Sequence, residues 1–194
     1  MPHVTVIGTG NMGQAIAGVL TKGGATVDMV GHADTDADVS GDIVVLAVPY
    51  PALDDVLAKR ADRLEGKVVV DITNPLNFET FDSLTVAADG SAAAELAQRL
   101  PSAKVLKAFN TTFAATLASG SVGDAPTTVF IAGDDVAAKP GVGRPRDRRW
   151  PAGVARRIPF PRARARGDGL PSDHPGGGRA TAVDGRVRRP VIVR

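Results

Sequence analysis

The stretch HVTVIGTGNMG at residues 3–13 decides the fold, because it joins a strand pattern, a glycine-rich turn and the start of a helix pattern. The apolar run at 3–7 predicts a strand, and the amphipathic residues 14–20 predict a helix. Between them, Gly8, Gly10 and Gly13 form the G-x-G-x-x-G arrangement of dinucleotide-binding turns. We expect Gly8 to allow a tight turn, Gly10 to admit a pyrophosphate, and Gly13 to let the helix approach the strand. The alternative is an ordinary glycine-rich turn in another kind of α/β protein.

Strand and helix patterns then alternate along the chain. Apolar runs predict strands at 3–7, 25–30, 43–48, 68–72, 104–107 and 127–132, and helices are predicted at 14–20, 51–63, 92–100 and 111–118. This alternation is typical of a Rossmann-type, doubly wound and mostly parallel sheet with right-handed crossovers. In such a sheet ligands bind beyond the carboxyl ends of the strands. The residues that directly follow each strand are therefore the candidates for a binding site.

The composition changes near Lys139. Residues 1–139 carry a net charge of −8, whereas residues 140–194 hold 14 Arg, no Lys and 4 Asp, a net charge of +10. The same 55 residues contain 8 Pro and 9 Gly and show no sustained helix or strand period. Such a segment cannot bury enough apolar surface to offset the entropy of ordering it. We therefore predict a dinucleotide-binding domain at 1–138 and an irregular Arg/Pro/Gly-rich basic tail at 139–194.

The turns after the strands resemble those of the NADP oxidoreductases that act on the deazaflavin coenzyme F-420. The matching segments are 7–13, 45–51, 71–76 (DITNPL), 106–111 (LKAFNT) and 130–135 (FIAGDD), and the resemblance covers about residues 3–138. It implies a domain that binds NADP(H), with the deazaflavin as co-substrate and hydride exchange between the nicotinamide and that planar acceptor. Because cofactors carry such a hydride, we expect orienting residues and no catalytic side chain.

The resemblance also implies roles for the turn residues. The pyrophosphate would lie against the backbone of Thr9, Asn11 and Met12, and the nicotinamide and its ribose near Val48 and Pro49. In the turns that follow, Asn74 (with Pro75) and Asn110 would offer side-chain amides to the ligand. The alternative for each asparagine is that its side chain caps its own turn.

The choice between NADP and NAD depends on the turn after the second strand. NAD-binding proteins place a carboxylate near this point, whereas NADP-binding proteins use residues such as Arg for the extra phosphate. This chain has Gly31 and His32, followed by Asp34. We include Gly31 and His32 in the predicted cofactor site, with His32 as a donor to a 2′-phosphate or as a solvated loop residue. NADP is favoured by the resemblance, and NAD stays open.

The composition and motifs of the chain limit which other functions are possible. The chain has no cysteine, and its three histidines are scattered, so we predict no metal site. The sequence shows no membrane-length apolar run or signal peptide, so we expect a cytoplasmic protein with a small-molecule redox acceptor. No reader motif for a specific nucleic acid is present. A dinucleotide-binding module without turnover, and an oxidoreductase that uses an imine, a flavin or ferric iron, are alternatives.

The tail has two interpretations. In relatives, this position holds a helical region that covers the acceptor site and pairs subunits as a homodimer. A single reading-frame offset can restore sequence similar to that region at 145–153, 167–171 and 183–189. We therefore hypothesise a frameshift near Lys139–Pro140, which would impair the acceptor half. The alternative is a genuine basic tail that binds polyanions without sequence specificity.

Overall fold

The computed structural model describes residues 1–135, 137–138 and 156–157. The described residues all belong to a first compact unit, Met1–Arg162. The second unit, Ala163–Arg194, contains none of the described residues. Of the predicted basic tail, only Arg156 and Arg157 are described. The predictions of an irregular tail and of a frameshift therefore lie almost entirely outside the described residues.

A seven-stranded sheet is the centre of this unit. The order across it is β2 (Thr26–Val30), β1 (His3–Ile7), β3 (Ile43–Leu46), β4 (Val68–Asp71), β5 (Lys104–Ala108), β8 (Phe130–Ala132) and β9 (Arg156–Arg157). All neighbouring strands are parallel except β5 and β8, which are antiparallel. The predicted Rossmann-type, mostly parallel sheet is confirmed.

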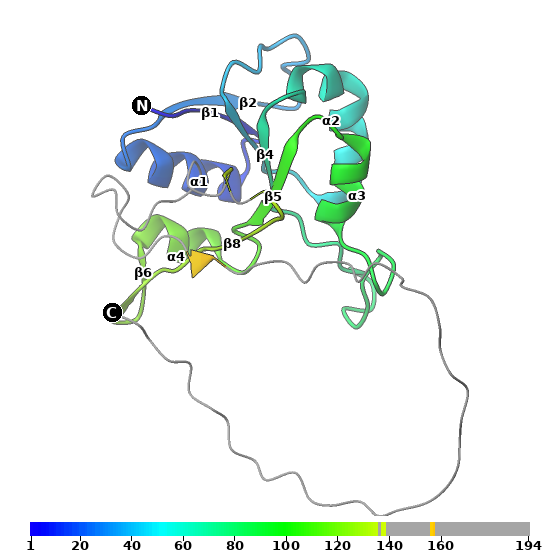
Figure 1. The fold of residues 1–194 in the computed structure, drawn as a ribbon. Helices are drawn as coiled ribbons and strands as arrows, with labels where there is room; N and C mark the ends of the chain where they lie inside the picture. Colours follow the sequence, from blue (N-terminus) through cyan, green and yellow to red (C-terminus); the bar gives the residue numbers. More distant parts are fainter. Residues whose placement is uncertain (136, 139–155, 158–194) are drawn as a thin grey trace, which may run out of the picture. The chain divides into compact units, whose positions relative to one another are not determined.

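Helices cover both faces of the sheet (Figure 1). On one face lie α1 (Asn11–Lys22) and α4 (Ala114–Ser119), whose Ile16 and Leu117 are buried in one apolar cluster. The other face carries α2 (Leu53–Arg60) and α3 (Ala92–Arg99), and Leu57 and Leu96 are buried in a second cluster. Short 3₁₀ turns, Tyr50–Ala52 and Ala61–Leu64, flank α2.

Strand β3 illustrates why the central strands are apolar throughout. Val45 belongs to the cluster under α1 and α4, whereas Val44 and Leu46 belong to the cluster under α2 and α3. All three are at most 1% exposed. Successive side chains of a strand point to opposite faces, so a strand covered on both faces must be apolar at every position.

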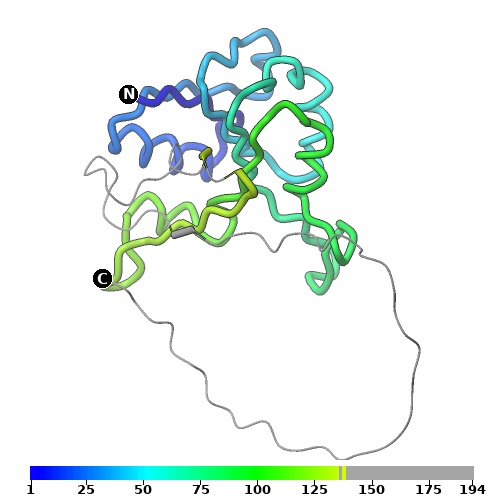
Figure 2. Tube along the Cα trace, viewed as in Figure 1, coloured from blue at the N-terminus to red at the C-terminus, as the bar shows by residue number. Residues whose placement is uncertain are grey.

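The strand order reverses at β1, because β2 lies on one side of it and β3 on the other. Figure 2 shows the chain passing from β2 to β3 through a long loop at 31–42, in which the structure has no helix. The loop is fixed to the sheet through the backbone N–H of Gly41, which donates to Thr5 Oγ1 at 3.0 Å. The crevice beyond the ends of β1 and β3 is the topological switch point, where ligands of such folds bind.

Some predicted element bounds were wrong. Strand β3 ends at Leu46 and not at residue 48, and Ala47 and the residues after it line the pocket described below. Helix α4 begins at Ala114, after an irregular turn at 109–113. The last predicted strand shortens to β8, and a hairpin of β6 (Ser121–Val122) and β7 (Ala125–Pro126) precedes it. Among the described residues, every helix is too short or too polar to cross a membrane.

Candidate functional site

The glycine-rich turn is tightly packed at two of its three glycines. Gly8 has a φ of +119°, and a Cβ added to it would lie 2.2 Å from the carbonyl oxygen of Ala47. A Cβ on Gly13 would lie 2.1 Å from the carbonyl oxygen of Gly8. Contacts this short are impossible, so the packing of β1, β3 and α1 itself requires glycine at both positions.

Gly10 differs, because no atom lies within 4 Å of a Cβ built on it and its φ is −70°. The protein's own packing therefore tolerates a side chain there, although it would project into the crevice. Gly10 is also the N-cap residue of α1, and no side chain caps this helix end. The first N–H groups of a helix carry partial positive charge and bind anions well. The turn thus combines an uncapped helix N-terminus with open space for a phosphate group.

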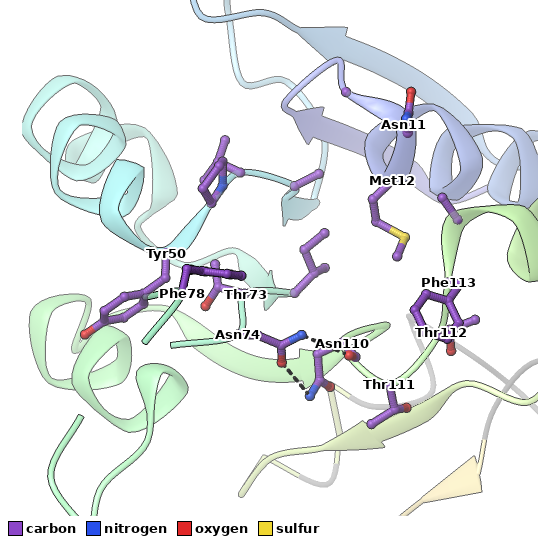
Figure 3. A pocket seen from close by; sticks show the side chains of 16 residues that line it. Asn11, Met12, Tyr50, Thr73, Asn74, Phe78, Asn110, Thr111, Thr112 and Phe113 are labelled. Atoms are coloured by element: carbon purple, nitrogen blue, oxygen red, sulfur yellow. Dashed lines mark hydrogen bonds between the residues drawn. The ribbon is translucent and has the colours of Figure 1, made fainter. Parts of the chain in front are cut away.

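A pocket of about 720 Å³ opens beside this turn. Its walls include the turns after β1, β3, β4 and β5, where the sequence predicted a site, and none of the sixteen described residues that line it is charged. Figure 3 shows Tyr50, Phe78 and Thr73 on one side of the pocket, with Met12 and Phe113 on the opposite side. The phenyl groups of Phe78 and Phe113 are largely exposed. The pocket therefore offers flat apolar surfaces and uncharged amide and hydroxyl groups.

Asn74 and Asn110 form a pair at the floor of the pocket (Figure 3). Asn74 Nδ2 donates to the backbone carbonyl of Asn110 at 3.1 Å, and Asn110 Nδ2 donates to Asn74 Oδ1 at 3.3 Å. Each amide thus holds the other in place. The alternative that each asparagine caps its own turn is not what the structure has, since the two side chains join two different turns.

A buried ion pair supports this amide pair from behind. Lys107 Nζ donates to Asp71 Oδ2 at 2.8 Å and also to the backbone carbonyl of Thr73, while the Thr73 N–H donates to Asp71 Oδ1 at 2.8 Å. The Asp71 side chain is fully buried and that of Lys107 is 15% exposed. Burial lowers the pKa of Lys107, and the Asp71 carboxylate opposes that change. The pair fixes the backbone that leads from β4 into Asn74.

Tyr50 forms part of the pocket wall and is anchored outside it. Its hydroxyl donates to Glu95 Oε2 at 2.6 Å, linking the turn after β3 to α3. This hydrogen bond, helped by burial, raises the pKa of Tyr50 to about 12. The phenol therefore stays neutral and keeps the ring in place over the whole physiological pH range.

The turn before α4 contains a strained residue. Phe109 has a positive φ of 63° although it is bulky, and its side chain is only 1% exposed. Such backbone conformations are costly and persist where the surrounding structure enforces them, often at functional sites. Here the positive φ of Phe109 turns the chain directly after β5, and Asn110, the next residue, lies against Asn74.

The structure places the sequence-predicted cofactor residues in two groups. Seven line the pocket: Gly10, Asn11, Met12, Val48, Pro49, Asn74 and Asn110. Gly8 and Gly13 pack beneath it, and the Pro75 carbonyl accepts a hydrogen bond from the Thr85 N–H at 2.8 Å. Their roles toward a cofactor stay predictions.

The turn at 31–32, which follows β2, does not line the pocket. Gly31 lies beside Thr9 and outside the pocket lining, because a Cβ on Gly31 would be 3.8 Å from Thr9 Cγ2. The imidazole of His32 is 89% exposed and lies 3.9 Å from Asp55 Oδ2. This turn thus lies next to the glycine-rich turn and outside the pocket, and the cofactor roles of Gly31 and His32 stay predictions.

Sequence reasoning missed several residues of the site. Phe78 and Phe113 line the pocket, and Lys107 with Asp71 supports it. A signal for the last two was present, because a lysine and an aspartate near the ends of neighbouring buried strands need partners. Phe78 and Phe113 carried no such signal, since they lie in irregular segments.

These features define a Rossmann-type fold with a glycine-rich turn and an uncharged pocket at its switch point. Residues 25–75 match the family model described as NADP oxidoreductase, coenzyme F420-dependent. The chain is 33% identical over 94 residues to the F420-dependent NADP reductase of Methanocaldococcus jannaschii, a match that covers 47% of this chain and 42% of that protein. Over these residues, the chain is therefore similar to the F420-dependent NADP oxidoreductases.

Solved structures agree. A crystal structure from Arthrobacter sp. FB24, assigned provisionally as an F420-dependent NADP-reductase, has a TM-score of 0.69 and 25% identity, covering 82% of this chain and 85% of that one. An imine reductase from Bacillus cereus has a TM-score of 0.52 and 22% identity, covering 71% of this chain and 49% of that one, and shows the fold alone. The predicted resemblance is confirmed. The predicted enzyme class and the cofactors NADP and F420 are those of the matched family.

Proposed function

We propose that this chain is an NAD(P)(H)-dependent oxidoreductase that exchanges hydride between a nicotinamide and a deazaflavin-type acceptor. The observation that carries the proposal is the position and surroundings of Gly10. This residue caps α1 without a side chain, faces open space, and borders a pocket lined by uncharged residues. The matched family supports NADP(H) as the dinucleotide and coenzyme F420 as the partner. The chain spans less than half of its curated relative, so the activity of the whole protein is part of the proposal.

The residues present fit a dinucleotide. The backbone N–H groups at the start of α1 would bind the pyrophosphate, with Thr9 and Asn11 beside it. Val48 and Pro49 would contact the nicotinamide end, since they follow β3 across the switch point and line the pocket. When bound, the nicotinamide ring supplies the hydride.

The pocket suits transfer between two flat rings. Met12 and Phe113 lie on one side, and Tyr50 and Phe78 lie on the other (Figure 3). These side chains offer flat apolar surfaces that can stack on the rings and orient them, which is the contribution that a protein makes to hydride transfer. Asn74 and Asn110 retain acceptor and donor capacity beyond their mutual hydrogen bonds, and can hold the amide or ring oxygens of a ligand. A charged acid or base is not required for this chemistry.

The biological setting is also proposed. The enzyme would act in the cytoplasm on a small-molecule redox partner, and the predicted homodimer depends on the region that lies outside the described residues. A dinucleotide-binding module without turnover would have the same turn and the same pocket. The two differ only in hydride transfer.

The test begins with binding. NADPH and NADH are titrated into the full chain by calorimetry, and the same titrations are made with Gly10→Val and Gly18→Val. Both glycines have open space around an added Cβ and lie in or next to α1, so neither change disturbs packing. We expect Gly10→Val to abolish binding and Gly18→Val to retain it, with both variants folded. Unchanged affinity in Gly10→Val would show that the turn is structural only.

The second step is turnover. Oxidation of NADPH or NADH is followed at 340 nm in the presence of oxidised deazaflavin, with a flavin as the control acceptor. Transfer to the deazaflavin alone supports the proposed acceptor class. Binding without transfer to either acceptor would contradict the proposed deazaflavin oxidoreductase and favour the binding module or another acceptor class.

A further inference from the structure

The loop between β2 and β3 has an unusual charge. Residues 31–42 contain four aspartates and one histidine, and the sequence holds no lysine or arginine between Lys22 and Lys59. This loop follows the strand that neighbours the glycine-rich turn, which is where Rossmann proteins contact the adenosine ribose. A 2′-phosphate at this point would meet an acidic segment.

Asp34 is placed to contact the ribose. Its Oδ2 accepts a hydrogen bond from the Gly31 N–H at 2.8 Å, which holds the carboxylate at the end of β2. The same position is next to the dinucleotide turn, because a Cβ on Gly31 would lie 3.0 Å from Asp34 Oδ2 and 3.8 Å from Thr9 Cγ2. The Gly8 N–H, in turn, donates to the Val30 carbonyl at 2.8 Å. The end of β2, the Asp34 carboxylate and the glycine-rich turn are therefore adjacent to one another and joined by hydrogen bonds.

Among the described residues, three cations in and after α2 are engaged elsewhere. Arg60 is 3% exposed, and its Nη2 donates to the backbone carbonyl of Asp34 at 2.5 Å. Arg63 Nη1 donates to the carbonyl of Ala37 at 2.8 Å, and Lys59 Nζ pairs with Asp55 at 2.8 Å. Arg60 and Arg63 thus hold the loop through its carbonyl groups. Both guanidinium groups are engaged by these carbonyls, and neither is paired with the Asp34 carboxylate, beside which a 2′-phosphate would lie.

We propose that Asp34 accepts a hydrogen bond from the ribose 2′-hydroxyl, and that this chain therefore binds NAD(H) at least as tightly as NADP(H). The inference rests on the proposed function, since it assumes a dinucleotide at the glycine-rich turn. A carboxylate is a strong acceptor for a ribose hydroxyl, whereas a 2′-phosphate would bring like charges together at Asp34. The loop thus departs from the NADP preference that the matched family's description states.

The experiment compares the two dinucleotides in the full chain. The Kd values of NADH and NADPH are measured for the wild type, Asp34→Asn, Asp34→Ser and the control Asp36→Asn, which removes a charge from the same loop. We expect the wild type to bind NADH at least as tightly as NADPH. Both Asp34 variants should shift the ratio of the two Kd values toward NADPH by roughly tenfold, because a like charge beside the phosphate is removed. Asp36→Asn should change the ratio less than about threefold, since screening weakens more distant surface charges.

Different results overturn different claims. If the wild type binds NADPH more tightly than NADH, or if both Asp34 variants leave the ratio unchanged, the inference about Asp34 is wrong while the proposed function stands. If neither dinucleotide binds, the proposed function fails and the inference fails with it. The thermal transition of each variant identifies any loss of folding, and the wild-type ratio tests the inference without a variant.

Discussion

Replacing Lys107 by methionine tests how the site is supported. Methionine has a similar length and no charge, so the change removes the ammonium group from its two acceptors, Asp71 Oδ2 and the Thr73 carbonyl. Asp71 is 0% exposed. In the variant its carboxylate would retain only the hydrogen bond from the Thr73 N–H, which is 2.8 Å long. Water cannot take the place of the lost cation at a side chain that is so deeply buried.

The expected loss follows from that burial. Removing one partner of a buried ion pair costs about 3–5 kcal/mol, because the other charge is left without compensation. For a domain of this size each kcal/mol lowers Tm by about 2–4 °C, so Tm should fall by about 6–20 °C. Urea unfolding followed by far-ultraviolet circular dichroism measures the free energy of unfolding directly.

The control is the double variant Lys107→Met/Asp71→Asn, in which the unpaired charge is also removed. It should recover about 2 kcal/mol or more of the loss, since a neutral amide is far less costly to bury than a carboxylate. A cost below about 1 kcal/mol in the single variant would refute the reasoning. So would a double variant that is no more stable than the single one, because the loss would then come from packing and not from charge.

Two further changes test the turn and the pocket wall. Gly8→Ala should lower the free energy of unfolding by about 3 kcal/mol or more, because its Cβ would lie 2.2 Å from the Ala47 carbonyl oxygen at a φ of +119°. Gly66→Ala, with a φ of +72° and open space, should cost about 1 kcal/mol in the same urea assay, and equal losses would contradict the steric argument. Tyr50 is the chain's one tyrosine, so absorbance at 295 nm should give a titration midpoint of about 12 in the folded chain and a value nearer 10.0 in Glu95→Ala. Because folding raises this pKa, the hydrogen bond stabilises the fold below pH 10, and this stabilisation is lost as the pH rises toward 12. A wild-type titration midpoint of 10 would refute the hydrogen bond between Tyr50 and Glu95.

The sheet was predictable because its information is local. An apolar run such as residues 43–46 must be buried on both faces, and β3 has Val44 and Val45 in the two opposite apolar clusters. The glycine-rich turn was predictable for the same reason, since strand, turn and helix follow one another within residues 3–22. Patterns of this kind depend on neighbours in sequence and need no knowledge of the rest of the fold.

The bounds of α4 were not predictable in this way. Residues 111–113 have no local feature that excludes a helix, but Phe109 is buried with a positive φ and turns the chain away first. That conformation is imposed by tertiary packing, which overrides the local preference of the sequence. The pocket wall at Phe113 depends on the same turn, so it could not be predicted either.

The amide pair at the floor of the pocket follows from a regularity shared by two segments. In DITN at 71–74 and in KAFN at 107–110, a charged residue precedes an asparagine by three positions. Strands β4 and β5 are parallel and pair Asp71 with Lys107, so the residues three positions further on, Asn74 and Asn110, also meet. A slip of one residue would turn every side chain of a strand to the other face. It would separate the buried charges as well as the two amides. The ion pair therefore favours this register together with the buried apolar pattern of the two strands, and the register positions the two amides at the pocket.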